Sequence, residues 1–188
     1  MRRAKAAAIE CLLALLLVGA RPAGAQSVTP VAQFDLNRFA GTWYEIARLP
    51  FKRQKTCVGD DFVQIGLGDK PNRFQYVNAC RLQSGDRDAW NANGRFEKKK
   101  VVDARMKISF LWPWYTKFWA LAIGPEYEWA LAGSPNHKNL WIFSREPKLD
   151  PGTLSQIEDR ARGMGFAVDK LQITPQSGAQ PGSGTRYH

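Results

Sequence analysis

The chain has 188 residues, a formal net charge of +10, 44% hydrophobic residues and 12% aromatic residues. This length is enough for a single domain with a substantial core. The positive residues are scattered apart from residues 98–100, and no zinc-ligand spacing or basic recognition helix accompanies them. We therefore expect no nucleic-acid partner, whereas attraction to anionic lipid headgroups stays open.

The amino terminus has the pattern of a secretory signal peptide. Three basic residues among the first five precede an apolar run over residues 12–18, which is too short to span a bilayer, and Ala23 and Ala25 form an A-x-A cleavage site. Cleavage after residue 25 would remove four positive charges and one negative charge, so the formal net charge would fall from +10 to +7. The predicted product is secreted or periplasmic and soluble.

A lipid anchor is not expected, because Glu10 stands before Cys11 where a lipidation signal would have a small residue. We expect residues 26–33 to form a linker and residues 34–175 a single domain. The tail, residues 176–188, is rich in Gly, Ser and Pro with almost nothing apolar to bury, so it is predicted to be disordered.

Short segments rich in aromatic and β-branched residues, separated by turn residues, fill the region between residues 35 and 175. This pattern is typical of an all-β domain. Nearly every link is short enough for a hairpin, and an even number of strands lets such a sheet close, which predicts an eight-stranded antiparallel up-and-down β-barrel. The expected strands are residues 41–49, 57–66, 73–82, 92–101, 104–110, 117–123, 127–133 and 139–145.

One helix is expected after the eighth strand. Asp150 is a suitable N-cap, Pro151 fits the first turn, and apolar residues recur at helical spacing from Leu154 through Ile157 and Ala161 to Met164. A glycine at 163 or 165 should end this C-terminal helix. Its apolar stripe predicts packing on the outside of the barrel, followed by a short strand near residues 170–174.

Three sequence blocks resemble the lipocalin family. Residues 41–45, GTWYE, follow an expected helical turn over residues 35–39; Pro125, Glu126 and Tyr127 match the turn between the sixth and seventh strands; and Ser144 with Arg145 matches the end of the eighth. The resemblance covers residues 34–175 and is closest to bacterial lipocalins of the outer-membrane type. It implies a barrel that binds a small hydrophobic ligand. The signal peptide departs from many bacterial members in having no lipid-acceptor cysteine.

The family motif also has a physical interpretation. A barrel with one open end needs a large apolar group at its base, and Trp43 can supply it. Arg145 could stack on the indole and donate to nearby carbonyl groups. We expect a structural role for Gly41, Trp43, Tyr127 and Arg145, with anion binding by Arg145 as the alternative.

Loops after the first, third, fifth and seventh strands should surround the open mouth, because successive strands alternate in direction. These are residues 50–56, 83–91, 111–116 and 134–138. The third follows Phe110 with Trp112, Pro113, Trp114 and Tyr115. This aromatic segment could be a packed collar, a lip at the ligand entrance or an anchor at a membrane interface.

Strand alternation predicts the cavity lining. If Trp43 and Arg145 face the base, then Trp141 and Phe143 point inward, and parity from Tyr127 favours Trp129 and Leu131. The resemblance adds Ile108 and Phe110 on the fifth strand and Ala120 and Ala122 on the sixth. The ligand-binding residues expected overall are Ile108, Phe110, Trp112, Trp129, Leu131, Trp141 and Phe143. A barrel of this size could instead fill itself with side chains.

The expected function is carriage or storage of a fatty acid or lysophospholipid outside the cytoplasm. A chain of about sixteen carbons gains roughly 12 kcal/mol gross from burial, against association costs of ~4–15 kcal/mol, so affinity near micromolar is expected. The headgroup could meet basic residues at the mouth, namely Arg48, Lys52, Arg53 or Lys55. A peripheral contact with membrane lipid is also open, and the oligomeric state is undetermined.

Enzymatic function is not expected. The only histidines are His137 and His188, which cannot build a multi-histidine metal site or a convincing Ser-His triad, and no cofactor is implied. Weaker alternatives are haem ligation by His137 and a role for Glu45 as a ligand contact or general base rather than as a satisfied buried carboxylate. A third hypothesis is an envelope interaction protein with a filled barrel.

Cys57 and Cys80 are the only cysteines expected after cleavage, and oxidised pairs persist in exported proteins. A turn centred near residues 68–72 would place residue 57 close to residue 80 or 81 on the neighbouring strand, which favours a disulfide. The alternative is a free thiol facing the ligand, as in some lipocalin isomerases.

Overall fold

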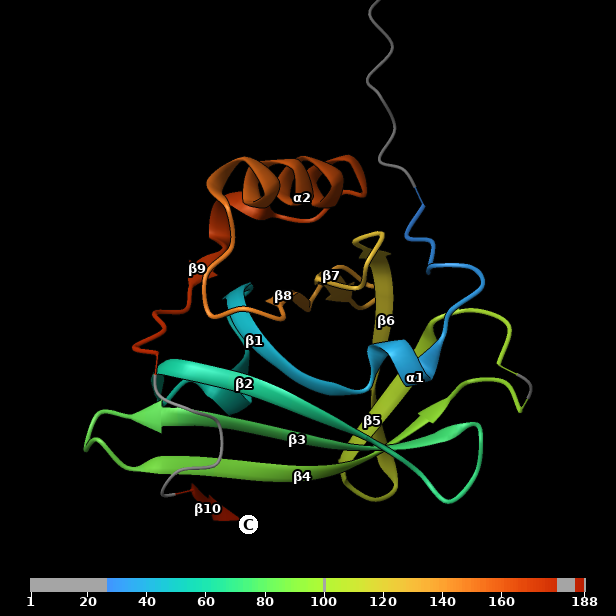
Figure 1. Cartoon of the computed structure of the whole chain (residues 1–188), viewed down its shortest axis with the longest axis horizontal. Coiled ribbons are helices and arrows are strands. Elements are labelled where there is room, and N and C mark those ends of the chain that lie inside the picture. The colour runs from blue at the N-terminus through green and yellow to red at the C-terminus, as the bar shows by residue number, and fades with distance from the viewer. Residues whose placement is uncertain (1–26, 100, 179–184, 188) are drawn as a thin grey trace, which may run out of the picture.

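The computed structural model describes residues 27–99, 101–178 and 185–187; the expected signal peptide lies outside these residues. Each of the eight main strands pairs antiparallel with the next, and β1 pairs with β8, so the sheet closes (Figure 1). The predicted up-and-down barrel is therefore confirmed. The strands are β1 Gly41–Arg48, β2 Cys57–Leu67, β3 Arg73–Leu82, β4 Arg87–Phe96, β5 Arg105–Leu111, β6 Trp114–Ile123, β7 Trp129–Gly133 and β8 Leu140–Ser144.

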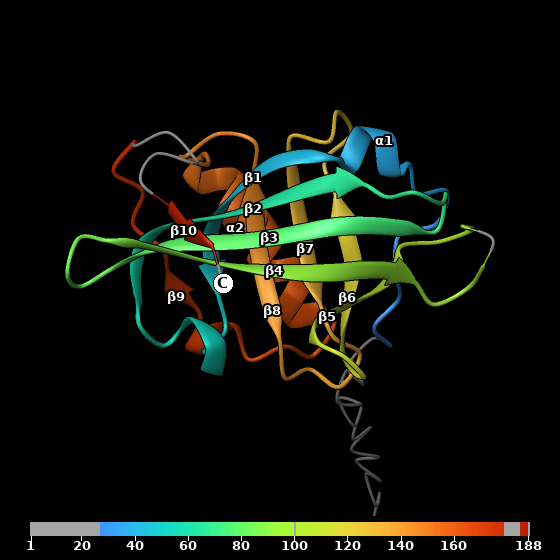
Figure 2. The same ribbon diagram turned by 90° about the horizontal axis from the view of Figure 1, so that it is seen from below.

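Two of the mouth loops are shorter than predicted. β4 begins at Arg87 rather than at residue 92, because Leu82 and Asp86 close a tight turn in which Gly85 adopts a φ of 89°. A positive φ is readily available only to glycine. β6 begins at Trp114, so β5 and β6 form a hairpin with only two turn residues between them. Figure 2 shows β1 to β4 lying side by side, with the β3–β4 turn extending well beyond the neighbouring strands.

The expected C-terminal helix is α2, Pro151–Gly163, and it lies outside the barrel (Figure 1). The Asp150 carboxylate accepts from the Thr153 N–H at 2.8 Å, which satisfies one of the unpaired donors of the first turn. Ile157 and Ala161 are buried against side chains of β6, β7 and β8. The predicted N-cap, apolar stripe and external packing are confirmed.

Short elements complete the fold. They are the helix α1, Leu36–Phe39, the 3₁₀ turns η1, Lys52–Gln54, and η2, Val168–Lys170, and the strands β9, Gln172–Ile173, and β10, Thr185–Tyr187. β9 pairs antiparallel with β1, as predicted for the segment after α2. No helix in the described part of the chain has the length and hydrophobicity needed to cross a membrane.

The described parts of the tail make specific contacts, contrary to the prediction of disorder for residues 176–188. The Gln176 amide donates to the backbone oxygens of Glu45 and Asp61, at 2.8 and 3.0 Å, and residues 185–187 pair in parallel with β4. The prediction considered apolar burial alone. Backbone pairing and amide hydrogen bonds need none, because they satisfy polar groups of the barrel directly.

Candidate functional site

Trp43 closes one end of the barrel. Its side chain is 1% exposed, and its indole N–H donates to the Phe39 carbonyl at 2.8 Å. The Arg145 guanidinium lies 3.7 Å from the centre of the indole ring, so the stacking predicted from the sequence is present. Burial lowers the pKa of Arg145 from its ordinary value, but an arginine remains charged at neutral pH.

Arg145 also joins the segments that meet at this end. It donates hydrogen bonds of 2.7–3.3 Å to four backbone carbonyls, those of Arg38, Ala40, Thr42 and Tyr127. Gly41 has a φ of +101°, and a Cβ there would lie 3.2 Å from Arg145 Nη1. Glycine therefore precedes the motif tryptophan for two reasons, the backbone conformation and the space that the guanidinium occupies.

The open mouth lies at the opposite end, where η1 faces the β5–β6 hairpin across a pocket of about 580 Å³. Its walls are largely apolar, and Lys52 and Arg53 supply positive charge on one side. The Arg53 guanidinium stacks 4.5 Å from the Phe110 ring centre. The lining residues are Phe51, Lys52, Arg53, Ile108, Phe110, Leu111, Trp114 and Thr116.

Of the predicted lining residues, Ile108 and Phe110 line this pocket, but Trp112 does not. Trp112 is 79% exposed at the hairpin turn, and Trp114 lines the pocket instead. Sequence reasoning missed Trp114 because it placed both residues in a long loop. Leu111 pairs with Trp114 across a two-residue turn, and this pairing places Trp114 on a strand beside the pocket and Trp112 in the turn.

Trp141 and Phe143 lie in the barrel interior, as predicted, in a packed aromatic cluster. The Phe118 ring is 5.8 Å from Trp141 and 6.2 Å from Phe143, and 5.5 Å from Tyr76. Trp141 also meets Phe51 of the mouth pocket edge to face, at 5.3 Å. The interior aromatic cluster therefore contacts the wall of the mouth pocket.

The prediction that Trp129 and Leu131 line the cavity is wrong. Both pack in the outer cluster beneath α2, whereas Ala130 and Ala132 belong to the interior cluster. The prediction counted alternating inward and outward positions along the strand from Tyr127. That residue, however, has a φ of 58° and lies in the turn before β7. Strict alternation of side chains holds only within continuous extended backbone.

The prediction for Ala122 is wrong for a related reason. The pairing of β6 with β7 shifts register between Ala120 and Ala122, so Ala120 belongs to the interior cluster and Ala122 to the outer one. A β-bulge adds one residue and reverses the faces that follow it. Composition carries no signal for such a shift.

A buried polar cluster fastens η1 to the barrel wall. The Gln54 amide donates to Glu45 Oε2 at 2.6 Å and to Asp61 Oδ2 at 2.7 Å, and its carbonyl oxygen accepts from the Trp141 indole at 3.2 Å. Glu45 and Asp61 are fully buried, and Gln54 is 2% exposed. Segment 50–56 is thereby held across one side of the mouth.

Charge in this cluster is unbalanced, since it contains two carboxyl groups and only one cation. Arg48 Nη1 donates to Glu45 Oε1 at 2.8 Å, and the Thr174 hydroxyl donates to the same oxygen at 2.6 Å. Burial, followed by the negative charge of Glu45, raises the pKa of Asp61 well above its ordinary value. Burial and these two carboxyl groups likewise raise the pKa of Tyr76.

This arrangement decides among the roles considered for Glu45 and Arg48. Glu45 is a buried carboxylate whose oxygens are satisfied by neighbouring side chains. Arg48 is 7% exposed and paired with Glu45, so it is not a free headgroup contact at the mouth. Lys52, Arg53 and Lys55 remain exposed there.

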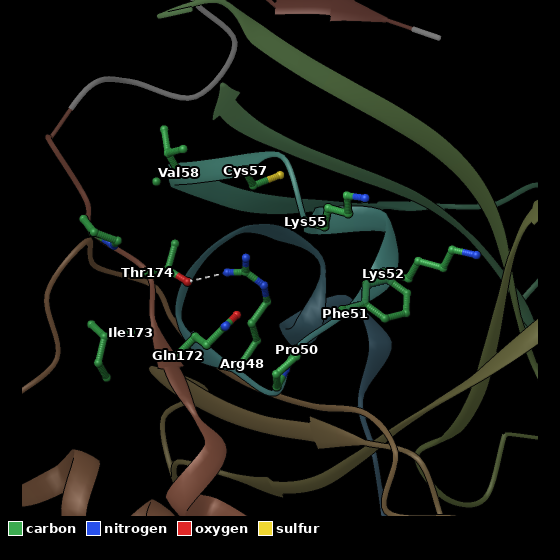
Figure 3. A pocket seen from close by; sticks show the side chains of 12 residues that line it. Arg48, Pro50, Phe51, Lys52, Lys55, Cys57, Val58, Gln172, Ile173 and Thr174 are labelled. Carbon is green, nitrogen blue, oxygen red and sulfur yellow. Dashed lines mark hydrogen bonds between the residues drawn. The ribbon is translucent and has the colours of Figure 1, made fainter. Parts of the chain in front are cut away.

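A second pocket, of about 650 Å³, lies beside the barrel between segment 50–59 and segment 172–175 (Figure 3). Arg48 extends into this pocket and donates to Thr174, while Lys52 and Lys55 lie along one edge. Polar side chains and backbone atoms form much of the wall of this second pocket. The mouth pocket, with its aromatic and aliphatic walls, is therefore the better candidate for an apolar ligand.

Cys57 and Cys80 form the predicted disulfide, with 5.6 Å between their Cα atoms. The predicted register is wrong, since Gly66 pairs with Gln75 and two irregularities near Gly59 bring Cys57 opposite Leu82 rather than opposite residue 80 or 81. Asp61 lies close to both sulfurs, but disulfide sulfurs are not the thiolates that bind metals. Neither cysteine is the free thiol of the isomerase alternative.

His137 does not face the barrel interior. Its Nε2 lies 2.9 Å from the Met164 carbonyl, and its ring contacts Phe166 in the outer cluster. The haem-ligand alternative therefore finds no support in the position of this residue.

The model of the lipocalin-like domain matches residues 34–176. The chain belongs to the lipocalin family. This lipocalin is 31% identical over 168 residues to outer membrane lipoprotein Blc of Citrobacter freundii, covering 88% of this chain and 92% of that one. It is 30% identical over 162 residues to temperature-induced lipocalin-1 of Arabidopsis thaliana, covering 82% and 86%. The resemblance to bacterial lipocalins is confirmed.

Solved structures agree on the fold. The structure of insecticyanin from the tobacco hornworm superposes with a TM-score of 0.65 at 18% identity, covering 89% of this lipocalin and 94% of that chain. Family and fold together support binding of a small hydrophobic ligand, in a family that is typically non-enzymatic.

Proposed function

We propose that this lipocalin binds a long-chain amphiphile with an anionic headgroup, a fatty acid or a lysophospholipid, at the mouth pocket, and does no chemistry on it. The observation that carries this proposal is the amphipathic lining of the pocket. Ile108, Phe110 and Trp114 provide apolar walls, and Lys52 and Arg53 stand together on one side. A volume of about 580 Å³ is within the usual range for small-molecule sites.

The acyl chain and the anionic headgroup of such a ligand would each contact side chains of the corresponding character, apolar or basic. The acyl chain would lie against Ile108 and Phe110, and the carboxylate or phosphate would lie against Lys52 and Arg53. Burial of methylenes, at about 0.8 kcal/mol each, drives binding, while exposed ion pairs add only about 0.2–1 kcal/mol each. The chain should therefore govern affinity and the charge should govern headgroup preference.

Calorimetry with palmitate and lysophosphatidic acid, on protein delipidated and refolded, tests the proposal. We expect one-to-one binding with a dissociation constant near micromolar. Tryptophan emission should change on binding, because Trp114 lines the pocket and Trp141 contacts Phe51. Absence of binding for every long-chain amphiphile at protein concentrations of tens of micromolar would refute the proposal.

Two variants separate the pocket from the rest of the barrel. Phe110→Asp, which puts a charge on the apolar wall, should abolish binding, and Arg53→Gln should weaken it by about two- to fivefold, the equivalent of one exposed ion pair. Lys55→Gln is the matched control, because Lys55 belongs to the same segment but lines the second pocket. Equal losses for Arg53→Gln and Lys55→Gln would contradict the assigned headgroup position.

We place this function outside the cytoplasm, after cleavage of residues 1–25, with residues 26–33 as a linker and residues 34–175 as the binding domain. The disulfide supports this location, because such bonds persist in oxidising compartments. Similarity to outer membrane lipoprotein Blc also supports a location in the cell envelope.

A second candidate is an envelope interaction protein with a filled barrel. The close contacts of Phe118 with Trp141 and Phe143 favour it, since they occupy the interior that a deeply bound ligand would need. The calorimetric experiment distinguishes the two functions, because an interaction protein of this kind binds no amphiphile either in the interior or at the mouth.

A further inference from the structure

The tip of the β5–β6 hairpin carries an unusual concentration of exposed apolar side chains. Six large hydrophobic residues are exposed in the described part of the chain, and three of them are here, Leu111 at 66%, Trp112 at 79% and Trp114 at 70%. Single exposed hydrophobic residues are ordinary, but adjacent ones mark interaction sites. The hairpin projects at the bottom of Figure 1, away from α2.

The shape and chemistry of this tip suit a lipid surface. Leu111 and Trp114 are cross-strand partners, so only Trp112 and Pro113 form the turn and the tip is narrow. A narrow apolar projection needs a matching groove on a protein partner, whereas a fluid bilayer adapts to it. Tryptophan is enriched at membrane interfaces, where its ring is buried and its N–H stays hydrated.

Positive charge surrounds the tip. Residues 48–59 and 104–124, which flank the mouth pocket, contain seven basic residues and no acidic residue. Three of them are ion-paired, Arg48 with Glu45, Arg105 with Asp103 and Lys117 with Glu97. The other four, Lys52, Arg53, Lys55 and Lys107, form no ion pair with another described residue.

Distances along the hairpin match the layers of a bilayer. Lys107 precedes Leu111 by four residues on β5, which corresponds to about 13 Å of extended strand. The polar headgroup layer on one side of a bilayer is about 5–8 Å thick. With the tip at the boundary of the acyl chains, Lys107 therefore lies just outside the phosphates, where attraction to anionic lipid is still strong.

We propose that the tip of the β5–β6 hairpin, Leu111 to Trp114, docks this lipocalin on an anionic phospholipid bilayer, with Lys52, Arg53 and Lys107 facing the lipid phosphates. Leu111, Trp114, Lys52 and Arg53 also line the mouth pocket. Docking consequently sets the pocket against the membrane, so that a ligand passes between bilayer and barrel with little exposure to water. This consequence rests on the proposed function, but docking itself does not.

Co-sedimentation with vesicles free of fatty acid and lysolipid tests the proposal. We expect the full chain to bind vesicles in which about a third of the lipid is phosphatidylglycerol, and to bind pure phosphatidylcholine at least about fivefold more weakly, the effect of a single basic residue near the surface. Brominated acyl chains should quench tryptophan emission of the bound protein. Equal binding to both vesicles, or no binding to either, would overturn the proposal.

Trp112→Ser is the decisive variant, because Trp112 is exposed and lies outside the mouth pocket. Removing the indole should lower the vesicle partition coefficient about tenfold or more. Leu67→Ser is the matched control, since Leu67 is 55% exposed at the end of β2, beside the closed end of the barrel, and should leave partitioning unchanged. Equal partitioning of Trp112→Ser and wild type would refute docking through this tip.

Two further measurements test whether the tip binds something other than a bilayer and whether docking is independent of ligand binding. If sedimentation velocity shows a dimer that Trp112→Ser dissociates, the tip binds a second copy of the chain and the membrane proposal is overturned. Palmitate calorimetry on Trp112→Ser separates the two proposals: intact ligand binding with lost vesicle binding supports docking. Vesicle binding without ligand binding in the wild type would refute the proposed function and leave docking in place.

Discussion

Trp43→Ala offers a quantitative test of the closed end of the barrel. The indole is 1% exposed, lies against Phe39 with 5.0 Å between ring centres, and has the Arg145 guanidinium 3.7 Å from its ring centre. Truncation of a buried tryptophan costs about 3–5 kcal/mol. For a domain of this size each kcal/mol lowers the unfolding temperature by about 2–4 °C, so we expect a drop of about 6–20 °C.

The assay is thermal unfolding followed by circular dichroism, with the disulfide intact in all variants. Trp112→Ala is the control, because it makes the same chemical change at a side chain that is 79% exposed and should alter stability by no more than about 0.5 kcal/mol. If both variants unfolded at the wild-type temperature, Trp43 would not be a structural plug. The assignment of the open and closed ends would then be lost as well.

Three other predictions concern stability. Reduction of Cys57–Cys80, which closes a loop with a sequence separation of 23, should lower the free energy of unfolding in urea by about 3 kcal/mol; alkyl uptake by unreduced, denatured protein would show instead that the thiols are free. Burial raises the pKa of Asp61, so this group stabilises the fold at low pH and the contribution is lost as pH rises through that pKa; Asp61→Asn should therefore remove a decline in stability above pH 3.8. Against desolvation by burial, hydrogen bonds from Ser177 and Arg81 lower the pKa of Asp60, so Asp60→Asn should remove a gain in stability that develops as pH rises toward 3.8 and levels off above it. Identical pH profiles for wild type and Asp61→Asn would contradict this reasoning. Gly41→Ala should cost about 1–3 kcal/mol because of its φ of +101°, and an unchanged urea midpoint would rule that strain out.

The amino-acid sequence by itself determined the architecture and the closed end. Strand-length runs separated by turns predicted eight strands, and capping by Asp150 with the stripe through Ile157 predicted the external helix. These signals are local, since each depends on residues a few positions apart. The family motif around Trp43 and the identity of the disulfide partners were likewise readable, because few residues could fill those roles.

The tertiary structure alone decided which side chains meet the ligand pocket. The register shift beyond Ala120 put Ala122 in the outer cluster, and the positive φ of Tyr127 put Leu131 beneath α2 instead of in the barrel. The alternation of inward and outward side chains continues from one residue to the next along a strand. A single irregularity therefore reverses the predicted face of every residue that follows it.

The buried cluster of Gln54, Glu45 and Asp61 was equally invisible in the sequence, although Glu45 itself was considered as a buried carboxylate. Its members come from β1, η1 and β2, and neither carboxyl group could be buried without the amide that bridges them. Burial of such groups is favourable only when all of their partners are in place, which is a property of the folded barrel and of no single segment.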